Sequence, residues 1–122
     1  MAKLRRTLAV ATVAVVPALV VSAQQQVATR RIPQLENEQV RVWKSIIAPH
    51  QPLSMHRHDH GRVIVALKGG ALKVVPEEGE PKVVEWETGK AYWLPADPPE
   101  ALHGDVNEGD HAIEVMVIEV QR

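Results

Sequence analysis

The chain contains no cysteine and no phenylalanine, and its aromatic residues make up only 3% of 122 positions. Without cysteine there is no disulfide framework, no thiolate metal ligand and no lipid-modified cysteine. The shortage of aromatic residues predicts an aliphatic core, with Trp43, Trp86 and Trp93 as its few large packing side chains. Positive charge is not in excess either, because the formal net charge is −1. We therefore expect no nucleic-acid partner, which would require a basic face.

Residues 1–23 have the pattern of an export signal. Residues 1–6 carry three positive charges, residues 8–21 are almost entirely apolar, and short side chains follow at positions 21–23. A charged region, an apolar region and a small-residue cleavage site define a secretory signal peptide. We expect cleavage after Ala23 and an exported protein, either periplasmic or secreted.

The alternative is a membrane anchor. The apolar run is shorter than the roughly 20 residues that span a bilayer, and Pro17 interrupts it. We therefore expect no stable membrane span after signal cleavage. The pair Arg5-Arg6 leaves open whether export follows the general route or the twin-arginine route.

The rest of the chain is typical of an all-β domain. Residues 24–38 are polar and are interpreted as a flexible leader, or as a strand that docks only on a partner. Residues 39–122 form the predicted domain, in which short runs rich in Val, Ile and Leu alternate with Pro, Gly, Asp and Glu clusters. This spacing indicates an antiparallel sandwich or barrel. The predicted strands are 39–48, 62–68, 71–75, 82–87, 91–94 and 112–120, and in the last of these Ile113, Val115 and Val117 share one face.

Histidine is concentrated in one part of the chain. All six histidines lie between residues 50 and 111, and the segment 56–60 contains three of them at alternate positions. On an extended strand, His56 and His58 point to the same face, so two imidazoles stand side by side as chelation requires. By itself this spacing is equally typical of a solvated histidine-rich loop that binds metal only adventitiously.

The residues around the histidines resemble the motifs of the cupin family. That family places two histidines one residue apart before a glycine, and later a glycine, a proline, a third histidine and an asparagine. The matches are His56, His58 and Gly69 or Gly70 in the first motif, and Gly89, Pro95, His103 and Asn107 in the second. The resemblance covers about residues 40 to 120. It implies a cupin-type double-stranded β-helix, a small jelly-roll barrel, in which His56, His58 and His103 converge on a divalent transition metal (Fe, Mn, Zn, Ni or Cu). It also implies that Asn107 ties the barrel together by hydrogen bonds.

The sequence departs from the family pattern at the fourth ligand. The glutamate of the first motif would fall at position 62 or 63, which are Arg62 and Val63. Three neutral imidazoles leave a divalent metal with a charge of +2, and such a site attracts anionic ligands strongly. Three-histidine sites are known among cupin dioxygenases, so the resemblance still implies metal binding. His60 is a candidate fourth ligand.

Arg62 has two interpretations. Its guanidinium either pairs with Asp59, Glu100 or Asp105, or it binds the carboxylate or phosphate of a substrate. A second departure lies between Pro95 and His103, where a proline-rich loop longer than the family pattern replaces the usual turn.

Two classes of function follow. The first is a metal-dependent enzyme of dioxygenase, isomerase or lyase type, acting on a small, anionic molecule, with Glu100 or His60 as a candidate base. The second is a non-catalytic module that binds a metal or small ligand, or that keeps a degenerate site. The fold does not decide between them. A homodimer formed through a barrel edge at the 39–48 strand is a further expectation, taken from the resemblance alone.

Overall fold

The computed structural model describes residues 2–3, 9–14 and 28–122. Most of the predicted signal peptide, including the cleavage site after Ala23, lies outside the described residues. Within those ranges, the structure has no helix that is long and apolar enough to cross a membrane.

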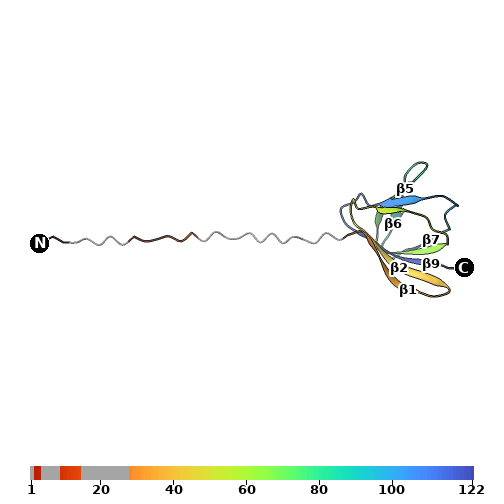
Figure 1. Cartoon of the computed structure of the whole chain (residues 1–122), viewed down its shortest axis with the longest axis horizontal. Helices are drawn as coiled ribbons and strands as arrows, with labels where there is room; N and C mark the ends of the chain where they lie inside the picture. Colours follow the sequence, from red (N-terminus) through yellow and green to blue (C-terminus); the bar gives the residue numbers. More distant parts are fainter. Residues whose placement is uncertain (1, 4–8, 15–27) are drawn as a thin grey trace.

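In residues 28–122, nine strands form two antiparallel sheets that face each other (Figure 1). The five-stranded sheet has the order β1-β2-β9-β4-β7, and the four-stranded sheet has the order β3-β8-β5-β6. The first sheet contains β1 (Arg30–Glu36), β2 (Val40–Ile47), β9 (Ile113–Val120), β4 (Arg62–Lys68) and β7 (Ala91–Leu94). The second contains β3 (Leu53–His56), β8 (His103–Val106), β5 (Gly70–Pro76) and β6 (Lys82–Trp86).

All six predicted strands are present, but the structure adds β1, β3 and β8. Strands β3 and β8 have only four residues each, with sequences LSMH and HGDV that carry no apolar run. The flexible leader predicted for residues 24–38 is wrong over β1, which pairs with β2 of the same chain. The segment was not recognised as a strand because an exposed edge strand needs few apolar residues. It also contains Pro33, which lies where the register shifts, and edge strands tolerate a proline at such a position.

The core lies between the sheets and is aliphatic, as predicted. It comprises Trp43, Ile47, Ile64, Leu72, Ile113, Val115 and Val117. The alternation in β9 is confirmed, because its odd-numbered residues from Ile113 to Val117 are buried. Each such aliphatic side chain contributes about 1.5–3 kcal/mol on burial.

Trp93 is not in the core, contrary to the prediction, because 59% of its surface is exposed. Strand residues alternate between faces, and on β7 it is Tyr92 and Leu94 that pack against the core. Trp93 instead lies on the outer face over Gly61, where a Cβ atom would come within 2.5 Å of the indole ring. Trp86 is half-buried and packs against the core, and Trp43 is part of it.

Two of the motif residues hold the barrel in shape. Asn107 is 1% exposed, and its amide donates to the carbonyl oxygens of Ile47 (3.0 Å) and His111 (2.7 Å). This confirms its predicted hydrogen-bonding role. Gly69 lies so close to the backbone of Trp86 that a Cβ atom would come within 2.0 Å of the Trp86 carbonyl oxygen, so only glycine fits there.

Candidate metal centre

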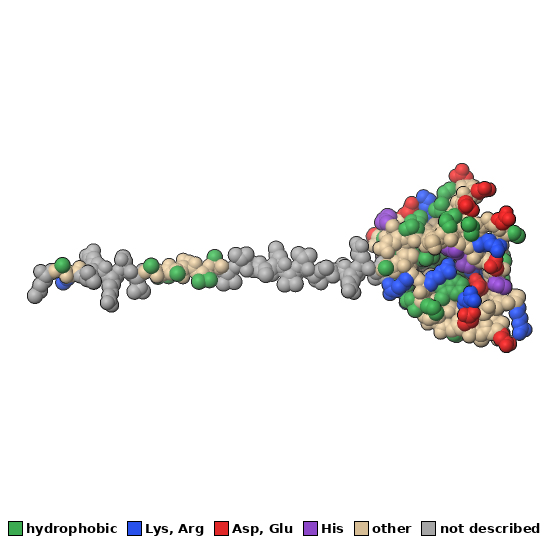
Figure 2. Space-filling model, viewed as in Figure 1, with side chains coloured by type: hydrophobic (Ala, Val, Ile, Leu, Met, Phe, Trp, Pro, Cys, Tyr) green, Lys and Arg blue, Asp and Glu red, His purple; other side chains and the backbone are tan. Residues whose placement is uncertain are grey.

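A cavity of about 470 Å³ opens between the two sheets. Its walls are mainly apolar and come from both sheets, including Trp43 and Val117 on one side and Leu72 and Trp86 on the other. Hydrophobic and histidine side chains are visible between the sheets in Figure 2. An apolar pocket with a few polar groups is the usual form of a small-molecule site.

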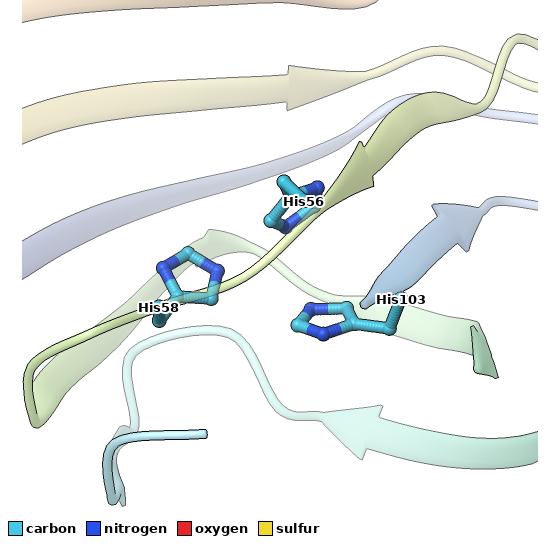
Figure 3. A group of neighbouring side chains, drawn as sticks. All are labelled: His56, His58 and His103. Atoms are coloured by element: carbon cyan, nitrogen blue, oxygen red, sulfur yellow. The ribbon is translucent and has the colours of Figure 1, made fainter. Parts of the chain in front are cut away.

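The three histidines of the family motifs line this cavity and converge (Figure 3). His56 ends β3, His58 follows two residues later, and His103 begins β8, where it is the cross-strand partner of His56. One ring nitrogen from each histidine lies within 4.8 Å of the other two. The prediction that these three side chains meet inside the barrel is confirmed.

The other three histidines lie apart from this group. His60 lines a separate hollow with Arg57 and Asp59, and the structure does not bring it together with the three-histidine cluster as a fourth ligand. His50 and His111 are exposed. Glu100, the other candidate base, is also exposed, and neither it nor His60 is among the cavity-lining residues.

Each histidine of the cluster faces a different carboxylate at 3.6 Å. The Nδ1 atom of His58 lies 3.6 Å from Glu119, and Nδ1 of His103 lies 3.6 Å from Asp97. His56 is different, because its Nε2 atom faces Asp105 while its Nδ1 lies 2.6 Å from the carbonyl oxygen of Ser54. A partner on Nδ1 holds the proton there and leaves Nε2 free to bind a metal. All three rings can therefore present Nε2.

Two of the histidines are held in the neutral form. Burial, together with the nearby Arg62 guanidinium and His56, lowers the pKa of His58 to about 3. Burial also lowers the pKa of His103. Burial raises the pKa of Asp105, although the neighbouring His103 and His56 oppose that shift. Neutral imidazole is the form that coordinates metal, so His58 and His103 are ready to bind without losing a proton.

The proline-rich loop positions one of these histidines. Asp97 lies on this loop, and its carboxylate accepts a hydrogen bond from the backbone N–H of His58 at 2.8 Å. The backbone N–H of Asp97 in turn donates to the carbonyl oxygen of His58 at 2.8 Å. Through these two hydrogen bonds the loop, which is longer than the turn in the family pattern, connects the second motif to His58 of the first motif.

Arg62 is buried, at 6% exposure, and lines the cavity. Its Nη1 donates to the carbonyl oxygen of Pro95 at 3.2 Å. Within residues 28–122, no carboxylate oxygen lies within 4.0 Å of its guanidinium, so none of the expected partners Asp59, Glu100 and Asp105 forms an ion pair with it. Burial lowers the pKa of Arg62, while Asp97 and Asp105 act at longer range to raise it.

The donor set fits a divalent transition metal. Imidazole nitrogens bind zinc at about 2.0–2.1 Å, so two of them on one ion lie no more than about 4.2 Å apart. The observed spread of 4.8 Å closes to that range with small rotations of the rings. The surroundings also match the charge of such an ion, because Asp97, Asp105, Glu119 and the Arg62 guanidinium together carry two net negative charges when ionised.

Sequence reasoning missed the carboxylates around the cluster. Asp105 stands two residues after His103 on β8, so the alternation that paired His56 with His58 also places it on the cavity side. Asp97 and Glu119 had no such signal. Asp97 reaches His103 from the proline-rich loop, and Glu119 reaches His58 from the far end of the chain.

The fold is that of solved cupin structures. A cupin domain from Bordetella pertussis aligns with 82% of this chain and 100% of its own, at a TM-score of 0.70 and 23% identity. An RmlC-like cupin with a double-stranded β-helix fold from Methanocaldococcus jannaschii aligns with 90% of this chain and 93% of its own, at a TM-score of 0.59 and 14% identity. The polyketide cyclase RemF from Streptomyces resistomycificus aligns with 70% of this chain and 57% of its own, at a TM-score of 0.51 and 18% identity.

No protein-family model and no curated protein matches the sequence. At these identities, the structural likeness establishes the cupin fold alone. The chain is therefore an all-β cupin-fold domain with three histidines placed to hold a metal ion.

Proposed function

We propose that this protein is an exported small cupin that binds one divalent transition metal through His56, His58 and His103 and a small anionic molecule in the adjoining cavity. The observation that carries the proposal is the convergence of three histidines on an apolar cavity of about 470 Å³. Such a site leaves coordination positions open to a ligand that enters the cavity.

The chain's own residues have separate roles in this proposal. A bound divalent metal with open positions supplies Lewis acidity or, as Fe(II), oxygen activation. Arg62 binds the anionic group of the ligand, because its buried guanidinium faces the cavity without an ion-pair partner within 4.0 Å in residues 28–122. The apolar walls, including Leu72 and Val117, exclude water from the rest of the ligand.

Two versions of this function differ in catalysis. In the enzyme version, the ligand is a substrate for oxygenation, isomerisation or lysis. RemF, a polyketide cyclase of related fold, supports this version. In the alternative, the domain binds the metal and ligand without reaction. The positions of Glu100 and His60 favour this alternative, because neither of the two predicted bases lines the cavity.

Metal content tests the shared part of the proposal. We expect purified protein to retain about one metal ion per chain, and His56→Ala and His103→Ala each to abolish this binding. His111→Ala is the matched control, since His111 is exposed and outside the cluster. If the cluster variants keep the metal content of His111→Ala, the proposed site is wrong.

Ligand binding then tests the role of Arg62. We expect the metal-loaded protein to bind small dicarboxylates or phosphorylated compounds, and Arg62→Gln to weaken this binding at least 10-fold without loss of metal. Turnover of any bound compound would establish the enzyme version. Equal binding of neutral and anionic probes by the wild type would remove Arg62 from the site.

Export and self-association remain part of the proposal. Fractionation of cells that express the full chain should place a shortened protein beginning at Gln24 outside the cytoplasm. A homodimer through a sheet edge is the proposed assembly. The 39–48 strand expected to form that edge is β2, which lies between β1 and β9, so the exposed edge on that side is β1. Sedimentation at several concentrations would measure the oligomeric state directly.

A further inference from the structure

We propose that Asp105 is the carboxylate ligand of the metal and takes the place of the glutamate that the first motif lacks. The proposal rests on the proposed function, since it requires a metal at His56, His58 and His103. The observation behind it is that Asp105 faces Nε2 of His56, whereas the other two carboxylates of the cluster face Nδ1 of their histidines.

The position of Asp105 follows from β8. It stands two residues after His103 on an extended strand, so both side chains point into the barrel. Both line the cavity, and the Asp105 side chain is 13% exposed. His56 lies across from His103 in the β3–β8 pair; its ring centroid is 4.5 Å from that of His103, and its Nε2 is 3.6 Å from Asp105.

The ring nitrogen that each carboxylate faces separates Asp105 from Glu119 and Asp97. Glu119 and Asp97 lie 3.6 Å from Nδ1 of His58 and His103, on the side of each ring away from Nε2. At His56, the carbonyl of Ser54 already occupies Nδ1 at 2.6 Å. The Oδ2 atom of Asp105 therefore faces the other ring nitrogen of His56, Nε2, at 3.6 Å.

A metal ion placed between Nε2 of His56 and Oδ2 of Asp105 can bind both, because imidazole nitrogen and carboxylate oxygen are both metal ligands. The distance of 3.6 Å is close to the spacing of neighbouring ligand atoms on one ion, which follows from metal–ligand bonds of about 2.1 Å. Asp105 is outside the set of atoms that lie within 4.8 Å of one another, so its side chain must turn further inward on binding.

A carboxylate ligand on β8 also explains why position 62 can carry an arginine. Position 62 faces the cavity from β4, where the family's glutamate would stand, and it carries a buried guanidinium instead. A carboxylate on β8 reduces the charge of the three-histidine metal from +2 to +1, and it leaves Arg62 free to bind the anionic ligand. In this proposal, Arg62 on β4 stands where the family has its glutamate, and Asp105 on β8 supplies the carboxylate instead.

Metal affinity of matched variants tests this assignment. The affinity of the full chain for Zn²⁺ and Co²⁺ would be measured by competition with a chromophoric chelator, and the visible spectrum of the Co²⁺ form recorded. Asp105→Asn removes the proposed ligand charge. Asp97→Asn and Glu119→Gln remove the same charge from carboxylates that lie 3.6 Å from the other two histidines. Asp105→Ser is the second variant, in case the asparagine amide disturbs folding or binds the metal itself.

We expect Asp105→Asn to raise the dissociation constant at least 100-fold and to change the Co²⁺ spectrum. The two controls should each raise it about 10-fold, as orienting partners do, and should keep the wild-type spectrum. A loss in the Asp105 variants no larger than in the controls, or an unchanged spectrum, would overturn the assignment while leaving the three-histidine site intact. Absence of metal binding by the wild type would instead overturn the proposed function itself.

Discussion

The two sheets of the barrel differ in what they contribute. Among the described residues, the five-stranded sheet carries nearly all of the buried aliphatic side chains, and Leu72 is the one member of the four-stranded sheet in the core cluster. The four-stranded sheet instead contributes β3 and β8, whose polar side chains His56, His103 and Asp105 line the cavity. The five-stranded sheet therefore supplies most of the core, and the four-stranded sheet supplies two of the three histidines and Asp105, while Arg62 and Glu119 reach the site from the five-stranded sheet.

The largest stability effect should come from the five-stranded sheet. Ile113→Ala removes a side chain that is 1% exposed, and such truncations cost about 2–5 kcal/mol. Urea unfolding of the metal-free protein would measure this loss. Metal affinity of the folded fraction should stay within about 2-fold of the wild type, because Ile113 does not line the cavity. A large loss of metal affinity in this variant would show that the core of the five-stranded sheet also determines the geometry of the metal site.

A second effect should appear on acidification. The pKa of His58 is about 3 in the native state against 6.5 for a free imidazole. Between these values the unfolded chain binds a proton that the native protein does not, so the free energy of unfolding decreases as the pH falls from about 6.5 towards 3. The lowered pKa of His103 acts in the same direction.

Comparison with His58→Gln isolates this contribution. Unfolding would be measured in urea at several pH values between 7 and 4, on metal-free protein. The variant should lose stability less steeply than the wild type across this range. Parallel curves for the two proteins would mean that His58 is not held neutral by the barrel.

The smallest effect should come from an aromatic residue outside both the core and the cavity. Trp93→Ala should change the free energy of unfolding by less than about 1 kcal/mol, since 59% of Trp93 is exposed on the edge strand β7. Urea unfolding of this variant beside Ile113→Ala provides the comparison. Losses of similar size would show that the outer face of the five-stranded sheet also stabilises the barrel.

The contrast between the sheets also explains what could be predicted from the sequence. Strands β4 and β7 were predicted with their observed bounds because apolar runs and turn residues mark them. Strands β3 and β8 were missed because their residues serve the cavity rather than the core. The edge strand β1 was mistaken for a leader because it is almost wholly exposed.

The candidate site was predictable to a similar degree. His56, His58 and His103 were found because motif spacing identifies them, and the structure brings them together. The role of Asp97 depends on the path of an irregular loop, and that of Glu119 on cross-sheet packing. Neither is encoded in local spacing. Asp105 could have been found by strand alternation, had β8 been recognised as a strand.

A crystal structure of the protein soaked with Zn²⁺ or Co²⁺, with anomalous scattering recorded at the metal's absorption edge, tests the central claim most directly. We predict one strong peak within the barrel, about 2.0–2.1 Å from Nε2 of His56, His58 and His103. Peaks only at surface histidines such as His60 or His111, with none at the three-histidine cluster, would contradict the account.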